Sequence, residues 1–173
     1  QCGMGRTGRM FAFENYGIRP DIMCMAKALG CGVPVGAFAV TEEVAGLSLE
    51  PGDHGTTYGG NPFVCRAVDK VLEIMERDDI TAHVSVVGGY LSKKLDELCG
   101  KYGCIIERRG LGLIQGLKMA DDAAINDIID AAREKGLILI TASENVIRML
   151  PPYIIEASDV DEGVGILDEV LKN

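Results

Sequence analysis

The sequence predicts an α/β fold in which short strands alternate with amphipathic helices. Two short apolar segments, 22–26 and 33–40, have the length of strands and are separated by glycines. Apolar residues at helical spacing follow from residue 62 to about residue 100. The rest of the chain alternates in the order helix, strands, helix, strands, helix, which is typical of a small α+β domain with a mainly antiparallel sheet.

The first forty-odd residues contain short elements. The glycine-dense loop 3–8 matches neither the phosphate-loop nor the dinucleotide-binding spacing, so we interpret it as a tight turn with positive φ angles. Residues 11–16 are expected to form a short helical turn that ends at Gly17. Segment 22–26 is predicted to be a buried strand, and residues 42–47 a brief helix or turn.

Two helices are predicted in the middle of the chain, and their apolar faces are expected to pack in a core. Asn61 has the position of an N-cap, and Pro62 that of the first helical turn. The first helix is expected to end near Arg77 and the second near Gly100. The apolar faces consist of Val64, Val68, Val71, Leu72 and Met75 in the first helix and of Val84, Val87, Leu91, Leu95 and Leu98 in the second.

Two strands with a bend or bulge between them are predicted over residues 104–119, where three glycines interrupt an apolar pattern. A helix is expected to start at Asp121 and Asp122 and to end at Gly136. Short strands are predicted at 137–140 and 145–150, and the proline pair 151–152 stops the second. Ser158 is expected to cap a last amphipathic helix.

Composition limits the possible partners. The 173 residues, 47% of them hydrophobic, can bury one core or two small ones. A net charge of −9 argues against nucleic acid and against an anionic membrane, because phosphate groups need a basic face. No apolar run approaches the length that spans a bilayer.

The six cysteines form no C-x-x-C pair and have no histidine at metal-ligand spacing, so no metal site is predicted. Cys24 and Cys65 lie in apolar patterns and are expected to pack as small hydrophobic residues. We expect reduced thiols and a cytoplasmic location.

A single lysine, Lys27, ends the first predicted strand, and the glycines that follow it let a ligand approach the backbone closely. Burial lowers the pKa of a lysine and favours the unprotonated amine that attacks a carbonyl carbon. The alternative is a lysine that extends from the strand end to the surface. From these residues alone, the surface position is favoured.

Two further positions have the chemistry of anion binding. Thr56 and Thr57 are flanked by glycines and offer hydroxyl donors on an open backbone, although a plain polar turn fits the composition better. Arg148 lies between two apolar residues of a short strand, so it points to the opposite face from both. Its planar guanidinium suits a carboxylate, and the alternative is a surface arginine paired with a local acid.

Four blocks in this order carry a family resemblance: residues 1–8 (QCGMGRTG), 20–30 (PDIMCMAKALG), 54–62 (HGTTYGGNP) and 146–152 (VIRMLPP). With these blocks the chain resembles the class III, pyridoxal-phosphate-dependent aminotransferases, and segment 32–37 (GVPVGA) is most similar to their acetylornithine branch. The resemblance implies the carboxyl-terminal part of a fold-type I transferase. Residues 1–78 would end the large domain with its connecting helix, and residues 79–173 would form the small domain.

The resemblance also implies roles for particular residues. Lys27 would hold pyridoxal 5′-phosphate through its amine and move the substrate proton. Gln1 would contact the ring oxygen of the cofactor, and Thr57 its phosphate across the interface of a homodimer. Thr56 would touch the substrate, and Arg148 would hold the α-carboxylate that the amino acid and the keto acid each present.

The implied reaction transfers an amino group between N-acetylornithine and 2-oxoglutarate in arginine biosynthesis. Other ω-amino substrates (succinylornithine, ornithine or 4-aminobutyrate) are the alternatives within the family, and a non-catalytic fragment or dimerisation module is the alternative outside it. In the family, Gln1 follows a segment whose aspartate pairs with the pyridine nitrogen. We therefore expect the chain to be part of a longer enzyme and to be inactive in isolation.

Overall fold

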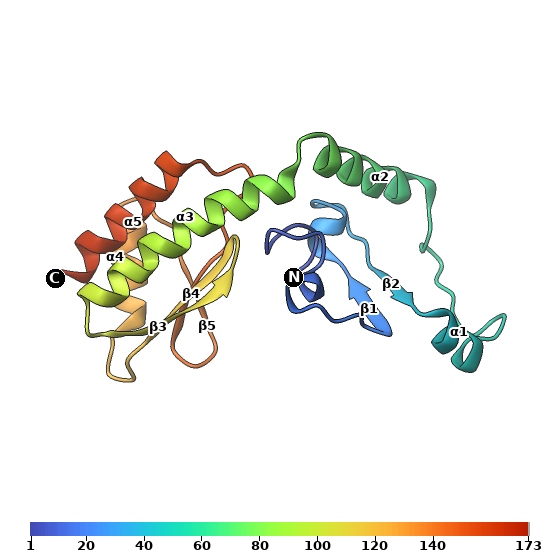
Figure 1. The fold of residues 1–173 in the computed structure, drawn as a ribbon, viewed down its shortest axis with the longest axis horizontal. Coiled ribbons are helices and arrows are strands. Elements are labelled where there is room, and N and C mark those ends of the chain that lie inside the picture. The colour runs from blue at the N-terminus through green and yellow to red at the C-terminus, as the bar shows by residue number, and fades with distance from the viewer. Residues whose placement is uncertain (173) are drawn as a thin grey trace.

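The computed structural model describes residues 1–172, and Figure 1 shows them as two groups of elements joined by consecutive helices. The amino-terminal group contains a two-stranded antiparallel sheet, in which residues 22 to 25 pair with residues 40 to 37. Its elements are η1 (Ala12–Tyr16), β1 (Ile22–Met25), η2 (Lys27–Leu29), β2 (Ala37–Val40), α1 (Glu42–Ser48) and α2 (Pro62–Arg77).

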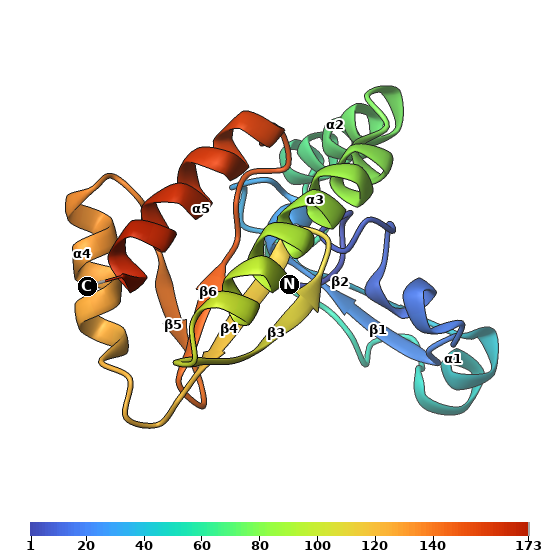
Figure 2. The ribbon, with the colours of Figure 1, turned by 60° about the vertical axis from the view of Figure 1, so that its left-hand side comes forward.

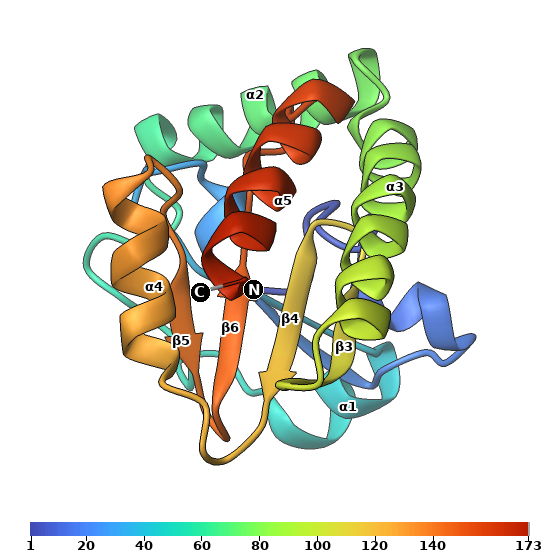
Figure 3. The same ribbon diagram turned by 90° about the vertical axis from the view of Figure 1, so that its left-hand side faces the viewer.

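The carboxyl-terminal group is a four-stranded antiparallel sheet in the order β3-β4-β6-β5, with three helices on one face. Figure 3 shows α3, α4 and α5 in front of this sheet, and α3 runs along the hairpin of β3 and β4 (Figures 1 and 2). The elements are α3 (Ile80–Lys101), β3 (Ile105–Leu111), β4 (Ile114–Met119), α4 (Ile125–Glu134), β5 (Ile140–Ala142), β6 (Val146–Met149) and α5 (Ala157–Leu171). The predicted α/β class and antiparallel sheet are confirmed.

The main core lies between this sheet and its three helices. Helix α3 contributes the five residues that its periodicity predicted, and the sheet contributes the side chains that alternate toward the helices. The core contains Val84, Val87, Leu91, Leu95 and Leu98 of α3, Leu113, Leu117, Met119 and Ile147 of the sheet region, Ile129 and Ala132 of α4, and Val160, Leu167 and Val170 of α5. A much smaller cluster, formed by Met4, Leu29 and Met75, holds the amino-terminal group together.

The amino-terminal loop joins the two groups through close backbone packing. The amide of Leu113 donates to the carbonyl of Arg6 at 2.9 Å. A Cβ atom at Gly112 would lie 2.6 Å from that same carbonyl oxygen, and a Cβ atom at Gly88 in α3 would lie 2.5 Å from the backbone of Gly112. Glycine at both positions therefore allows loop, hairpin and helix to touch.

The predicted domain boundary falls between α2 and α3. Ile80 packs against both the main core and the small cluster, so the two groups share a residue at this point. The division into residues 1–78 and 79–173 stays a prediction, and Asn173 lies outside the described residues.

The ends of helices were predicted correctly where residues next to the helix end determine them. The side chain of Asn61 accepts a hydrogen bond from the amide of Val64 at 3.0 Å, and Pro62 begins α2. Gly17 ends η1 with a φ angle of 63°. Both predictions are confirmed.

Burial was predicted less well in the amino-terminal group. Strand β1 is half-exposed because it has a single neighbouring strand and no helix covers it within residues 1–172, so the expected buried strand is wrong. Cys24 of β1 and Cys65 of α2 are both exposed, so their expected packing as small hydrophobic residues is also wrong, although all six cysteines are free as expected. The apolar face of α2 buries only Met75.

Three boundaries in the carboxyl-terminal group were also wrong. Helix α4 begins at Ile125 and not at Asp121 and Asp122. The amide of Leu137 donates to the carbonyl of Ala132 and closes α4, so β5 begins at Ile140 instead of residue 137. Helix α5 begins at Ala157, because the Asp159 carboxylate accepts the amide hydrogen of Glu156 at 2.9 Å, and Ser158 is not its cap.

No helix within residues 1–172 combines the length and the apolar character that a membrane crossing requires.

Two adjacent glycines in α3 give a matched test of the close packing. Alanine at an exposed helix position is favoured over glycine by about 1 kcal/mol. Gly89 has nothing within 4 Å of a Cβ atom, so Gly89→Ala is expected to raise the free energy of unfolding by up to about 1 kcal/mol. Gly88→Ala is expected to lower it by about 1–3 kcal/mol, because the new methyl group meets the backbone of Gly112. Urea unfolding of both variants measures the difference, and equal effects would contradict this packing.

Asp168 joins α5 to the end of α3 and gives a pH dependence. Hydrogen bonds from Lys101, Lys172 and Tyr102 hold the pKa of its carboxyl below the ordinary value of 3.8. The stabilisation is therefore present above about pH 4 and is lost as pH falls toward the lowered pKa. We expect Asp168→Asn to lower the melting temperature at pH 7 and to have a smaller effect at pH 2, where part of the stabilisation has been lost. Asp130→Asn, in an exposed pair within α4, is the control with little effect at either pH.

Candidate functional site

A cavity of about 590 Å³ lies between the amino-terminal loop, β1 and η2, and it reaches the segment that follows β6. Residues 1–4, 11–13 and 22–28 form most of its wall, and Arg6, Pro20, Leu150 and Tyr153 complete it. The segments that build the wall are therefore brought together from both ends of the chain.

The backbone at Lys27 is shaped by its neighbours. Ala26 is extended, and Lys27 adopts a left-handed φ angle of 53° before the single turn of η2. This turn buries Leu29 against Met4 and Met75, so the apolar contact two residues later fixes the direction of the chain. Lys27 lies at the cavity wall because the burial of Leu29 holds η2 in this position.

The amine of Lys27 donates a hydrogen bond to the side-chain oxygen of Gln1 at 2.9 Å. The structure thus brings together two of the predicted site residues. Both side chains are exposed within the described chain, so Lys27 has the surface position that the residues alone favoured.

The loop that carries Gln1 is a tight turn, as predicted. Met4, Gly5 and Gly8 have positive φ angles, and the amide of Gly8 donates to the carbonyl of Gly5 at 3.0 Å. A Cβ atom at Gly8 would lie 2.7 Å from the hydroxyl oxygen of Ser85 in α3. The glycines serve close packing against the helix.

Arg6 and Tyr153 form a contact that the sequence did not reveal. The guanidinium carbon of Arg6 lies 4.0 Å from the centre of the Tyr153 ring. Burial raises the pKa of the Tyr153 phenol above its ordinary value of 10.0, and the Arg6 charge partly offsets this. The only signals in the sequence were an arginine within the glycine loop and a tyrosine directly after two prolines.

Arg148 lies on β6, opposite Gly116 of β4 and Ile140 of β5. Ile147 and Met149 pack in the helix-covered core, so Arg148 is on the other face of the sheet. Its Nε atom is buried and has no hydrogen-bond partner among residues 1–172. A buried, unpartnered guanidinium nitrogen is costly unless a ligand pairs with it.

The structure does not bring the other predicted residues to the cavity wall. Thr56 and Thr57 lie in an exposed loop between α1 and α2, and neither lines the cavity. His54, in the same loop, packs edge-on against the Phe38 ring with the ring centres 4.8 Å apart. Arg148 is two residues from Leu150, which does line the cavity.

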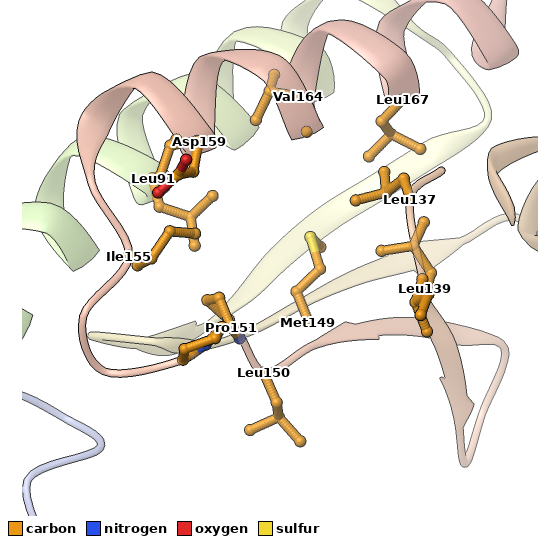
Figure 4. A pocket seen from close by; sticks show the side chains of 14 residues that line it. Leu91, Leu137, Leu139, Met149, Leu150, Pro151, Ile155, Asp159, Val164 and Leu167 are labelled. Atoms are coloured by element: carbon orange, nitrogen blue, oxygen red, sulfur yellow. The ribbon is translucent and has the colours of Figure 1, made fainter. Parts of the chain in front are cut away.

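A second cavity of about 410 Å³ lies beneath α5 (Figure 4). The labelled side chains of Leu137, Leu139, Met149 and Leu167 surround it, and Asp159 is the only ionisable residue of its wall. The Asp159 carboxylate already accepts the amide hydrogen of Glu156. This apolar space offers neither a nucleophile nor a cation, so the Lys27 cavity is the candidate site.

Comparison with known proteins gives the family of the chain. The family model described as "Aminotransferase class-III" matches residues 1–171. The acetylornithine aminotransferase of Methanocaldococcus jannaschii is 48% identical over 170 residues, which cover 98% of this chain and 42% of that protein. The acetylornithine aminotransferase of Clostridium acetobutylicum is 44% identical, with 99% and 44% covered.

Solved structures give the same result. A structure of acetylornithine aminotransferase from Elizabethkingia anophelis has a TM-score of 0.90 at 26% identity, covering 99% of this chain and 44% of that one. The chain belongs to the class-III aminotransferase family, whose members are pyridoxal-phosphate-dependent enzymes, and it has the fold of the carboxyl-terminal part of such an enzyme. It spans less than half the length of the curated relatives described above.

The unpartnered nitrogen of Arg148 predicts an uncommon stability effect. Arg148→Met removes a guanidinium with no structural bond at Nε, so the unliganded protein is expected to keep its stability or to gain up to about 1 kcal/mol. Arg108→Met is the matched control on the same sheet. Arg108 donates to the buried oxygen of Gln115 at 3.1 Å, and its loss is expected to cost about 1–3 kcal/mol. Urea unfolding compares the two, and an equal loss would indicate that Arg148 has a structural role.

Proposed function

We propose that this chain is part of a pyridoxal-phosphate-dependent aminotransferase that transfers the amino group of N-acetylornithine to 2-oxoglutarate in arginine biosynthesis. The observation that carries the proposal is the Lys27 amine, paired with Gln1 at the wall of a cavity of about 590 Å³. Membership of the family, together with the names of its relatives, supports the reaction and the acetylated substrate.

The residues at the cavity fit the cofactor. The cavity volume is within the range of small-molecule sites, and the Lys27 side chain supplies a primary amine at the cavity wall. Lys27 would hold pyridoxal 5′-phosphate through Nζ, and Gln1 would contact the ring oxygen. When bound, the cofactor withdraws electrons from the carbon that carries the amino group.

Lys27 would then act as the base of the reaction. Its Nζ atom would take the proton from the substrate carbon. The side-chain oxygen of Gln1 accepts a hydrogen bond from this Nζ atom at 2.9 Å and so orients the amine. The chain thus supplies both the attachment point and the group that moves the proton.

Arg148 would hold the α-carboxylate of the keto acid. A guanidinium with a buried Nε and no partner within residues 1–172 is ready for an anion that binds at two points. The carbonyl carbon of 2-oxoglutarate is bonded directly to its α-carboxylate, whereas the reacting amine of N-acetylornithine is several bonds from the carboxylate. One fixed arginine cannot hold both in the same way, so we assign Arg148 to the 2-oxoglutarate half-reaction.

The remaining roles involve a second subunit. Thr57 would bind the cofactor phosphate in the site of a partner subunit, and Thr56 would touch the substrate there. Their exposed loop, which lies away from the Lys27 cavity, is consistent with this arrangement. We therefore propose a cytoplasmic homodimer.

Glutamate formation tests the reaction. We expect the holoenzyme to use N-acetylornithine and 2-oxoglutarate with a kcat/KM at least about tenfold above that for ornithine, succinylornithine or 4-aminobutyrate. Lys27→Ala is expected to lower kcat by at least about 100-fold, because the attachment point and the base are both lost.

Lys70→Ala is the control for this experiment. Lys70 is exposed in α2 and pairs with Glu73, so its removal is expected to leave the rate unchanged. Borohydride reduction of the holoenzyme, followed by peptide mapping, is expected to place the cofactor on Lys27. A preference for ornithine would move the protein to another branch of the family, and an active Lys27→Ala enzyme would refute the mechanism.

A further inference from the structure

Arg6 connects the amino-terminal loop to the end of β6. Its Nη1 atom donates to the carbonyl oxygen of Pro151 at 2.5 Å and, more weakly, to that of Leu113 at 3.4 Å. The same guanidinium covers the ring of Tyr153. No carboxylate within residues 1–172 pairs with it, so its bonds to this segment are to backbone oxygens and an aromatic face.

The side-chain contacts of Arg6 add to a backbone connection at the same residue. The carbonyl of Arg6 accepts the amide hydrogen of Leu113, and Gly112 packs against the peptide of Arg6 and Thr7. The loop is thus attached to the β3–β4 hairpin by its backbone and to the β6 end by its side chain.

The contacts of Arg6 connect the segment that contacts the Lys27 amine with the segment that carries the Arg148 guanidinium. Gln1, which contacts the Lys27 amine, begins the segment that contains Arg6. Pro151 follows Arg148 by three residues, and Pro151 and Pro152 form a stiff segment because the φ angles of proline are fixed. A displacement of the Pro151 carbonyl therefore also displaces the end of β6.

We propose that Arg6 is a positioning residue that sets the distance between the Lys27 amine and the Arg148 guanidinium. This inference rests on the proposed function, because it takes Arg148 as the group that holds the α-carboxylate of 2-oxoglutarate. Arg6 also lines the cavity, but in this role it acts through its hydrogen bond to the Pro151 carbonyl. It fixes the strand end that carries Arg148 against the loop that carries Gln1.

Lysine cannot replace arginine in this arrangement. A guanidinium is planar, so it can stack on a ring while its N–H groups donate in the plane to two carbonyl oxygens. An ammonium group keeps the charge but has no planar face. Arg6→Lys therefore retains the positive charge but loses the planar group that stacks on Tyr153 and donates to the two carbonyl oxygens. Arg6→Met loses both the charge and the planar group.

Steady-state kinetics of the holoenzyme test the proposal, because the two half-reactions are separable in a ping-pong mechanism. In both Arg6 variants the KM for 2-oxoglutarate is expected to rise by about tenfold, since a small misplacement weakens the hold on the carboxylate. The KM for N-acetylornithine is expected to change by less than about twofold, and kcat by less than about threefold. Arg133→Met, which loses only an exposed pair within α4, is the control without effect.

Hydrogen exchange of the protein without cofactor gives a second measurement that does not depend on activity. We expect the amide of Leu113 and those of residues 146–150 to exchange faster in Arg6→Met than in the parent or in Arg133→Met. Unchanged exchange at these positions would overturn the proposal, as would an equal loss in both half-reactions. A parent holoenzyme that fails to use 2-oxoglutarate would instead refute the proposed function, and the exchange measurement would still decide whether Arg6 holds the strand end.

Discussion

The backbone of Gly112 lies between α3 and the amino-terminal loop, and the arrangement of the site depends on this contact. A methyl group at Gly112 would lie 2.6 Å from the carbonyl oxygen of Arg6, and one at Gly88 would lie 2.5 Å from the backbone of Gly112. Three segments far apart in the sequence can therefore meet with no side chain between them. Because the loop begins with Gln1 and the hairpin pairs with β6, this contact determines how the Lys27 side of the cavity faces the strand of Arg148.

Polar residues on the two faces of the four-stranded sheet differ in their hydrogen bonding. Gln115 is almost fully buried toward the helices, and its amide donates to Ser92 and Gly112 while its oxygen accepts from Arg108. On the opposite face, Arg148 keeps a buried Nε atom without a partner in the described chain. Gln115 has the complete set of hydrogen bonds that is typical of a structural polar group. Arg148 has the incomplete set that is expected of a group that binds an anion.

The sequence predicted the features that neighbouring residues determine. It predicted less well the features that depend on residues far apart in the chain. The N-cap at Asn61, the turn at Gly17 and the buried stripe of α3 depend on residues within a few positions, and all three were predicted. The exposure of Cys24 depends on which elements cover β1, and the late start of β5 depends on a hydrogen bond that closes α4. For the site, the resemblance marked Lys27, Gln1 and Arg148. The contact between Arg6 and Pro151 spans 145 positions, and no periodicity or motif reports it.

The left-handed backbone of Lys27 has a consequence for selection on this chain. A residue with a side chain at a φ angle of 53° is held there at a cost of order 1–3 kcal/mol, which glycine would largely avoid. Screening this position for thermal resistance alone would therefore favour loss of the amine. In the proposed role of Lys27, the amine would be kept for its chemistry at the expense of stability, so the two requirements oppose each other at the same peptide unit.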